Sequence, residues 1–143
     1  MKTNLPLYVT QPSLPALEDL LPMLQEIWDR RWLTNNGPFH QRLETELARH
    51  LGVEHLSLFS NGTLALMTAM QAQGIQGEVI TTPFSFIASS NCILYVGAKP
   101  VFVDICPKTL NMDPTLIEKA ITRRTKAILA VETFGNPAHM DQY

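Results

Sequence analysis

The stretch EVITTPFSFIASSNCILYVGAKPVFVDI, residues 78–105, decides the fold. It opens with an apolar strand pattern over 78–82 and continues with a mostly apolar helix over 85–97 that ends at a glycine. A second strand pattern follows over 100–105. A strand, a helix and another strand in close succession are typical of two parallel strands joined by a crossover helix. We therefore predict a β-α-β unit in this part of the chain.

The same alternation continues on both sides of this unit. Short strands are expected over 55–59 and 126–132, and helices over 63–74 and 113–121. Near-continuous apolar strands that alternate with helices indicate a mostly parallel sheet with helices on both faces and right-handed crossovers. The sequence thus predicts an α/β fold, whose ligands would bind beyond the carboxyl ends of the strands.

The N-terminal third has a different pattern. The first dozen residues look like an extended arm, and an amphipathic helix is expected within 13–32, with Ser13 as its N-cap. Pro22 should kink this helix or delay its regular part. A second amphipathic helix is expected over 39–52, closed by Gly52.

We therefore predict two parts. Residues 1–52 would form the arm and helices, and residues 53–143 the first part of the α/β domain.

The bulk composition narrows the function classes. The 143 residues are 45% apolar and carry a net charge of -2, with no basic stripe for a nucleic-acid polymer. No stretch resembles a signal peptide or a membrane span. Cys92 and Cys106 have no nearby Cys/His pattern, and His40, His50, His55 and His139 show no metal spacing. Reduced thiols in a cytoplasmic protein without a metal are the favoured interpretation.

The segment SNGT, residues 60–63, could hold an anion. Gly62 permits close approach, and the amides of Gly62, Thr63 and Leu64 would point outward at a helix start, where the helix dipole favours a phosphate. Thr63 could add its hydroxyl. The same residues could equally form a capping turn. They match neither the P-loop pattern nor the Rossmann glycine fingerprint.

Two aromatic residues follow the strand at 78–82. Phe86 could stack on a flat heterocycle or pack in the core, whereas Phe84 is expected in the core. Four polar residues are best interpreted as caps and turn residues: Asp104, Asn111, Asp113 and Glu132. Together, the phosphate loop and the aromatic residue suit a flat, phosphorylated cofactor.

At this point a family resemblance becomes specific. The segments SNGTLAL, GEVITTPFSFIASSNCILYVGAKPVFVDI, LNMDPTLIEKAITRRTKAI and FGNPAHMD occur in the order seen in the DegT/DnrJ/EryC1/StrS sugar aminotransferases. The upstream segment WLTNNGPFHQRLETELARHLGV resembles that family's entry segment. The resemblance runs from about Pro12 to Asp141.

The resemblance implies a cofactor and a fold. Family members bind pyridoxal 5'-phosphate on the aspartate-aminotransferase architecture (PLP fold type I), and this chain would be the N-terminal part of its large domain. The motif match implies that the cofactor is held by Asn61, Gly62, Thr63 and Phe86, with Phe86 stacked on the pyridine ring. It implies that a sugar-nucleotide pocket, completed across a homodimer interface, involves Leu33, Thr34, Asn35, Asn36 and Gly37.

The resemblance also implies a reaction. Glutamate would give its amino group to the cofactor, which would pass it to a nucleotide-linked keto-deoxysugar. The chain looks closest to enzymes that act on TDP-4-keto-6-deoxyglucose, in the biosynthesis of amino sugars for surface polysaccharides such as O-antigen or for antibiotics.

The family's Schiff-base lysine and the aspartate that pairs with the pyridine nitrogen lie downstream of the GNPAHMD motif. None of the lysines here matches the catalytic motif, so the chain is expected to be part of a protein two to three times longer and inactive alone. A further departure is Glu132, where members commonly carry histidine.

Three alternatives stay open: a sugar dehydratase of the same family with histidine in place of the lysine, an inactive regulatory or binding protein on the same fold, and a self-contained small phosphate-binding domain.

Overall fold

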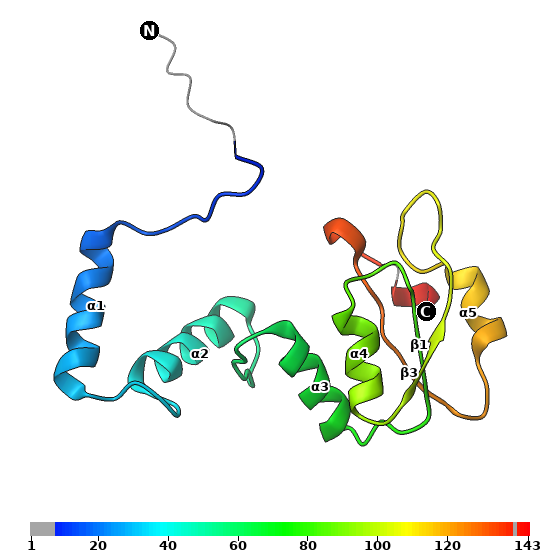
Figure 1. Ribbon diagram of the computed structural model, residues 1–143, viewed down its shortest axis with the longest axis horizontal. Helices are drawn as coiled ribbons and strands as arrows, with labels where there is room; N and C mark the ends of the chain where they lie inside the picture. Colours follow the sequence, from blue (N-terminus) through cyan, green and yellow to red (C-terminus); the bar gives the residue numbers. More distant parts are fainter. Residues whose placement is uncertain (1–7, 139) are drawn as a thin grey trace, which may run out of the picture. The chain divides into compact units, whose positions relative to one another are not determined.

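The computed structural model describes residues 8–138 and 140–143 (Figure 1). Most of the expected N-terminal arm therefore lies outside the described residues, as does His139. Contacts divide the chain into two compact units, one that ends at Leu58 and one that runs from Phe59 to Tyr143.

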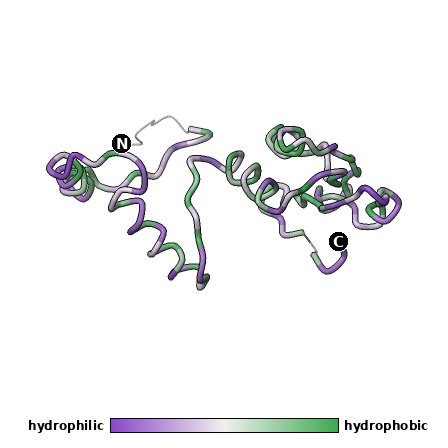
Figure 2. Tube along the Cα trace, turned by 90° about the horizontal axis from the view of Figure 1, so that it is seen from below, coloured by the Kyte–Doolittle hydropathy of each residue, from purple (hydrophilic) through white to green (hydrophobic). Residues whose placement is uncertain are grey.

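The first unit contains two amphipathic helices, α1 (Leu17–Arg30) and α2 (Pro38–Leu51). Purple and green stretches alternate along the helices near the N-terminus in Figure 2, as expected for amphipathic helices. The prediction of two helices is confirmed, and Gly52 ends α2 with a left-handed φ of 67°. None of the residues described in this unit is buried.

The predicted start of the first helix is wrong. The residue before α1 is Ala16, which has an extended backbone and no capping side chain, rather than Ser13. Pro15 disfavours the helical conformation at Leu14, so the helix cannot reach back to a cap at Ser13. The helix begins before Pro22, so Pro22 does not delay its start.

The second unit is built on a three-stranded parallel sheet. Its strands are β1 (Glu78–Thr81), β2 (Lys99–Phe102) and β3 (Thr125–Ile128), in the order β2-β1-β3. All four residues of the central strand β1 are buried. The predicted parallel sheet is confirmed, although each strand ends earlier than the apolar pattern suggested.

Helices cover both faces of this sheet. The neighbours Val79 and Ile80 point to opposite faces, as successive residues of a strand must, and belong to two separate apolar clusters. The first cluster joins α3 (Gly62–Ala72) and α4 (Ala88–Tyr95) to the sheet, and the second joins α5 (Pro114–Ala120). The buried members of the two clusters are Met70, Val79, Cys92, Ile93 and Ala98, and Ile80, Val103, Met112 and Ile117.

The strand predicted over 55–59 does not form. A strand needs a neighbour for its backbone hydrogen bonds, and the sheet of the described residues offers none to this segment. The Leu58 amide instead donates to the Glu44 carboxylate of α2, at 3.0 Å.

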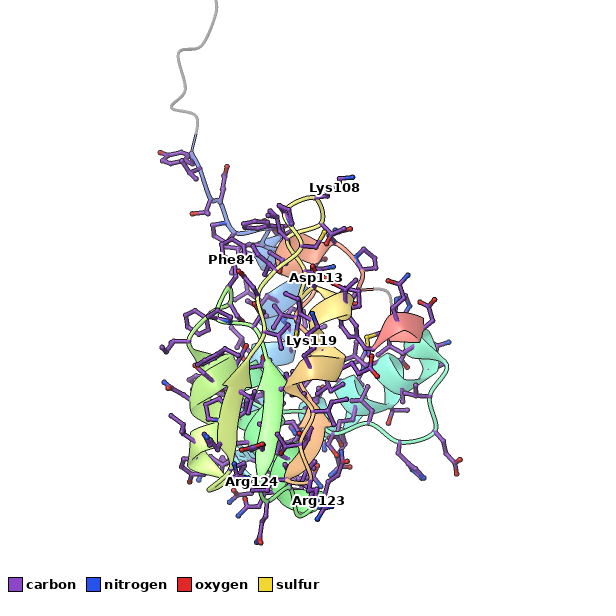
Figure 3. The ribbon with its side chains drawn as sticks, turned by 90° about the vertical axis from the view of Figure 1, so that its right-hand side faces the viewer. Phe84, Lys108, Asp113, Lys119, Arg123 and Arg124 are labelled. Atoms are coloured by element: carbon purple, nitrogen blue, oxygen red, sulfur yellow. The ribbon has the colours of Figure 1, made fainter. Side chains whose placement is uncertain are left out.

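A buried carboxylate fixes the amino end of the sheet. Glu78 accepts hydrogen bonds from the Thr122 hydroxyl and the Arg124 guanidinium, both at 2.6 Å, and the Lys99 ammonium lies 3.8 Å away. Figure 3 shows Arg124 at one end of the strands and Phe84 at the other. The end that carries Phe84 is the carboxyl end, where ligands of such sheets bind.

Candidate functional site

The loops after β1 and β3 border an open cavity of about 430 Å³ at the carboxyl end of the sheet. One wall comes from residues 83–86, between β1 and α4, and the other from residues 131–134, between β3 and the short 3-10 helix η1 (Thr133–Gly135). Segments almost 50 residues apart in the sequence therefore meet where the fold predicts a ligand site.

Three phenylalanines line this cavity and are substantially exposed. Phe84, Phe86 and Phe134 expose 44%, 78% and 86% of their surface. Phe84 and Phe134 pack edge to face, with ring centroids 6.3 Å apart. The expectation that Phe84 lies in the core is wrong, because the β1–α4 loop turns it toward the cavity. Clustered exposed aromatic rings mark a binding surface.

Hydrogen bonds hold the first wall in place. The buried Thr82 hydroxyl accepts from the Phe84 amide at 3.2 Å. The buried Thr81 hydroxyl donates to the Leu129 carbonyl at 3.0 Å, which ties the ends of β1 and β3 together. These two hydrogen bonds therefore anchor the base of the aromatic cavity to the sheet.

Asn111 holds the second wall. Its side chain is buried, accepts from the Thr133 amide and donates to the Asn136 carbonyl, both at 2.9 Å. The Asn136 side chain in turn donates to the Thr109 carbonyl at 3.0 Å. The sequence-based interpretation of Asn111 as a turn residue missed these contacts, because they join residues more than 20 positions apart.

Phe134 is a further residue of the cavity that the sequence did not lead us to predict. Its φ of 55° lies in the left-handed region, which is unfavourable for a non-glycine residue. The signal that could have found it is its position just beyond an apolar strand, at the ligand edge of the sheet. Glu132, expected as a turn residue, lines the same cavity.

The SNGT loop forms the start of α3. Asn61 caps the helix, and its side-chain oxygen accepts from the Leu64 amide at 3.0 Å. The Leu64 amide is therefore not available to an anion, contrary to our expectation, whereas the amides of Gly62 and Thr63 occupy the first turn, where a helix has no acceptors of its own. The Cys92 thiol donates to the Thr63 carbonyl at 3.4 Å and ties this loop to α4.

Open space surrounds Gly62. A β-carbon built on it would meet nothing within 4 Å, and its φ lies outside the left-handed region. Neither packing nor backbone conformation requires a glycine here, so the residues present leave room for a ligand against the free amides.

The residues expected to bind the sugar nucleotide line one hollow of the first unit. Leu33, Thr34, Asn35, Asn36 and Gly37 all border a cavity of about 190 Å³ between α1 and α2. The Trp32 indole donates to the Thr34 carbonyl at 2.6 Å. Asn35 and Asn36 have φ of 54° and 59°, so the backbone of both residues lies in the left-handed region.

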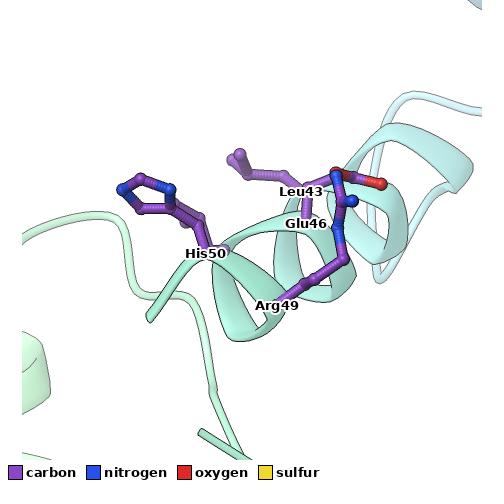
Figure 4. A pocket seen from close by; sticks show the side chains of 5 residues that line it. Leu43, Glu46, Arg49 and His50 are labelled. Atoms are coloured by element: carbon purple, nitrogen blue, oxygen red, sulfur yellow. The ribbon is translucent and has the colours of Figure 1, made fainter. Parts of the chain in front are cut away.

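A larger hollow of about 590 Å³ lies along α2 and is bordered by Leu43, Glu46, Leu47, Arg49 and His50 (Figure 4). Glu46 and Arg49 form an ion pair there. Because all its residues come from one exposed helix and none of the predicted site residues lies in it, this hollow is not the candidate site.

Within residues 8–138 and 140–143, no three His, Cys, Asp or Glu side chains gather to hold a metal ion. Over the same residues, no helix has the length and apolar character needed to cross a bilayer.

Comparison with known proteins decides the family. The model of the DegT/DnrJ/EryC1/StrS aminotransferase family matches residues 16–143. The chain belongs to this family. It is 55% identical over 134 residues to an Escherichia coli dTDP-4-amino-4,6-dideoxy-D-glucose transaminase. The aligned region covers 94% of the chain and 36% of the relative. The chain thus spans about a third of the length of this curated relative.

Two solved structures have the same fold. DesI, crystallised with its TDP-sugar product, matches 96% of the chain and 35% of its own length, with a TM-score of 0.87 and 36% identity. NtdA from Bacillus subtilis, crystallised with the cofactor PMP, matches 88% of the chain and 29% of its own length, with a TM-score of 0.83 and 37% identity. The predicted family and the fold type I architecture are confirmed.

Proposed function

We propose that the full-length protein is a pyridoxal 5'-phosphate-dependent aminotransferase that transfers the amino group of glutamate to a nucleotide-linked keto-deoxysugar, TDP-4-keto-6-deoxyglucose. The observation that carries the proposal is the 55% identity to a dTDP-4-amino-4,6-dideoxy-D-glucose transaminase. The likeness to DesI, crystallised with a TDP-sugar, supports the same substrate class.

The residues of this chain suit the cofactor. We assign the cofactor phosphate to the free amides of Gly62 and Thr63 and to the Thr63 hydroxyl, with Asn61 capping the same helix. We assign the pyridine ring to the exposed face of Phe86 in the aromatic cavity. When bound, the cofactor supplies the electron sink of the reaction.

The protein residues bind and orient the reactants. The hydrogen bonds of Thr81 and Thr82 fix the end of β1 and the start of the loop that carries Phe86. We assign the turn of residues 33–37 to the sugar-nucleotide pocket, because its hollow offers amide and carbonyl groups beside the Trp32 ring.

The proposal also covers the oligomeric state, the cellular location and the domain division of the protein. We infer a homodimer with shared active sites, since none of the described residues of the first unit is buried within this chain. A cytoplasmic location suits the two cysteines, which are both free thiols. We propose that residues 1–52 form the arm with its helices and that residues 53–143 form the first part of the cofactor-binding domain.

One assay tests the reaction. The full-length protein, loaded with pyridoxal 5'-phosphate, should convert TDP-4-keto-6-deoxyglucose and glutamate into a TDP-amino sugar and 2-oxoglutarate, detected by mass spectrometry. Formation of a deoxygenated sugar instead of an amino sugar would identify a dehydratase. No cofactor absorbance at 400–430 nm would indicate a binding protein without this chemistry.

A further inference from the structure

The Thr133 hydroxyl is a buried polar group without a partner. Thr133 is only 8% exposed, and its Oγ1 atom finds no hydrogen-bond partner among the described residues. Buried hydroxyl groups are almost always hydrogen-bonded, and an exception calls for an explanation such as a missing ligand. Thr133 is among the residues that line the aromatic cavity, so a ligand bound there would lie beside this residue.

The backbone of Thr133 is held without help from its hydroxyl. Its amide donates to the Asn111 side chain at 2.9 Å, and Asn111 itself is anchored to Asn136 at 2.9 Å. The hydroxyl is therefore not needed to place the residue. A hydrogen-bonding group that is already in position and has no partner suits a binding site, because little conformational entropy is lost when the ligand binds.

The surroundings of Thr133 define the shape of that ligand. Phe84, Phe86 and Phe134 supply aromatic walls to a cavity of about 430 Å³. Aromatic walls favour a flat ring, and a polar group on the same wall favours a ring with an oxygen at its edge. A pyridine ring with an oxygen substituent has both features.

We propose that Thr133 is a ligand-binding residue whose hydroxyl donates a hydrogen bond to the oxygen substituent at the edge of the cofactor ring, while Phe86 covers the ring face. This inference rests on the proposed function and adds to it a polar contact from the loop after β3. Asn111 acts as the positioning residue, since it holds the Thr133 backbone.

The test measures the affinity of the full-length protein for pyridoxamine 5'-phosphate. This form keeps the ring oxygen and cannot form a Schiff base with a lysine, so its binding is non-covalent. Thr133→Val has nearly the same shape without the hydroxyl and should weaken binding roughly tenfold. Thr133→Ser keeps the hydroxyl and should bind within about threefold of the wild type. Thr68→Val, the same change on the exposed side of α3, is the matched control.

A stability measurement separates binding from folding. If the hydroxyl has no partner in the free protein, Thr133→Val should leave the thermal midpoint of the cofactor-free protein unchanged or raise it, because a methyl group replaces an unpaired buried polar atom. A structural hydroxyl would instead lower that midpoint. Weaker binding together with unchanged or higher stability is the expected result.

Two results would overturn the inference. One is equal affinity of Thr133→Val and the wild type; the other is equal loss of affinity in the valine and serine variants. Either result leaves the proposed function in place as long as the wild type binds the cofactor. If the wild type itself fails to bind pyridoxamine 5'-phosphate, the proposed function is wrong, and this inference falls with it.

Discussion

At the residue scale, a substitution of Gly62 should weaken cofactor binding without weakening the fold. A β-carbon on it would meet open space, and its backbone conformation suits any residue. Gly62→Ala should therefore leave the free energy of unfolding unchanged or raise it by less than about 1 kcal/mol. The added methyl group would lie against the free amides and should weaken the binding of pyridoxal 5'-phosphate. Thermal unfolding without cofactor and a cofactor titration check the two effects, and an unaltered affinity would remove the phosphate from this loop.

Phe86 is a second residue whose exposed ring suits a role in ligand binding. Because it is 78% exposed, Phe86→Ala should change the stability of the cofactor-free protein by only about 0.5 kcal/mol. Loss of ring stacking, worth roughly 0.5–1.5 kcal/mol, should weaken cofactor binding and shift the absorption maximum of the bound cofactor. Tyr95→Ala, which removes an aromatic ring of 69% exposure from the end of α4, is the control and should leave the spectrum unchanged.

At the element scale, the amino end of the sheet depends on one ionised carboxylate. The hydrogen bond from Thr122, then the charges of Arg124 and Lys99, hold the pKa of Glu78 below its usual value. Because the pKa of Glu78 is lower in the folded state, its ionised carboxylate stabilises the fold at pH values above the unfolded-state pKa of about 4.3. This stabilisation is lost as the pH falls through the folded-state pKa of Glu78.

This linkage predicts a difference between two variants. Glu78→Gln should lower the thermal midpoint at pH 7. The difference in thermal midpoint between this variant and the wild type should become smaller as the pH falls below about 4. Glu54→Gln, which alters an exposed carboxylate of the other unit, should show no comparable change. A gap that stays constant from pH 7 to pH 3 would show that the charge of Glu78 does not stabilise the sheet.

The elements also show how far the sequence alone could lead. The β1-α4-β2 unit was predictable because its apolar runs and the glycine after the helix are local signals. The strand over 55–59 was not correctly predicted, since pairing depends on a neighbour rather than on the apolar pattern. Asn61 was predictable as part of a loop at a helix start, but its occupation of the Leu64 amide was not. The contact of Asn111 with Thr133 spans 22 positions, and no local pattern encodes it.

At the scale of the whole molecule, the two units differ in how their helices are stabilised. In the second unit, α3, α4 and α5 pack on a buried sheet. In the first unit, α1 and α2 have no buried residue, and α1 leaves Leu17, Leu21 and Trp28 more than half exposed. Isolated helices of 14 residues are marginal in water, so these helices need apolar partners outside their own unit.

This contrast leads to a prediction for hydrogen exchange. In the 143-residue chain, the amides of β1 and α4 should exchange slowly, whereas those of α1 and α2 should exchange at nearly the rate of an unfolded peptide. In the full-length protein, α1 should become protected, because the proposed dimer and the remaining chain would cover its apolar face. Mass spectrometry of both proteins under the same conditions measures the difference. Equal protection of α1 in the two proteins would mean that the first unit folds by itself, and the exposed leucines would then no longer argue for a partner surface.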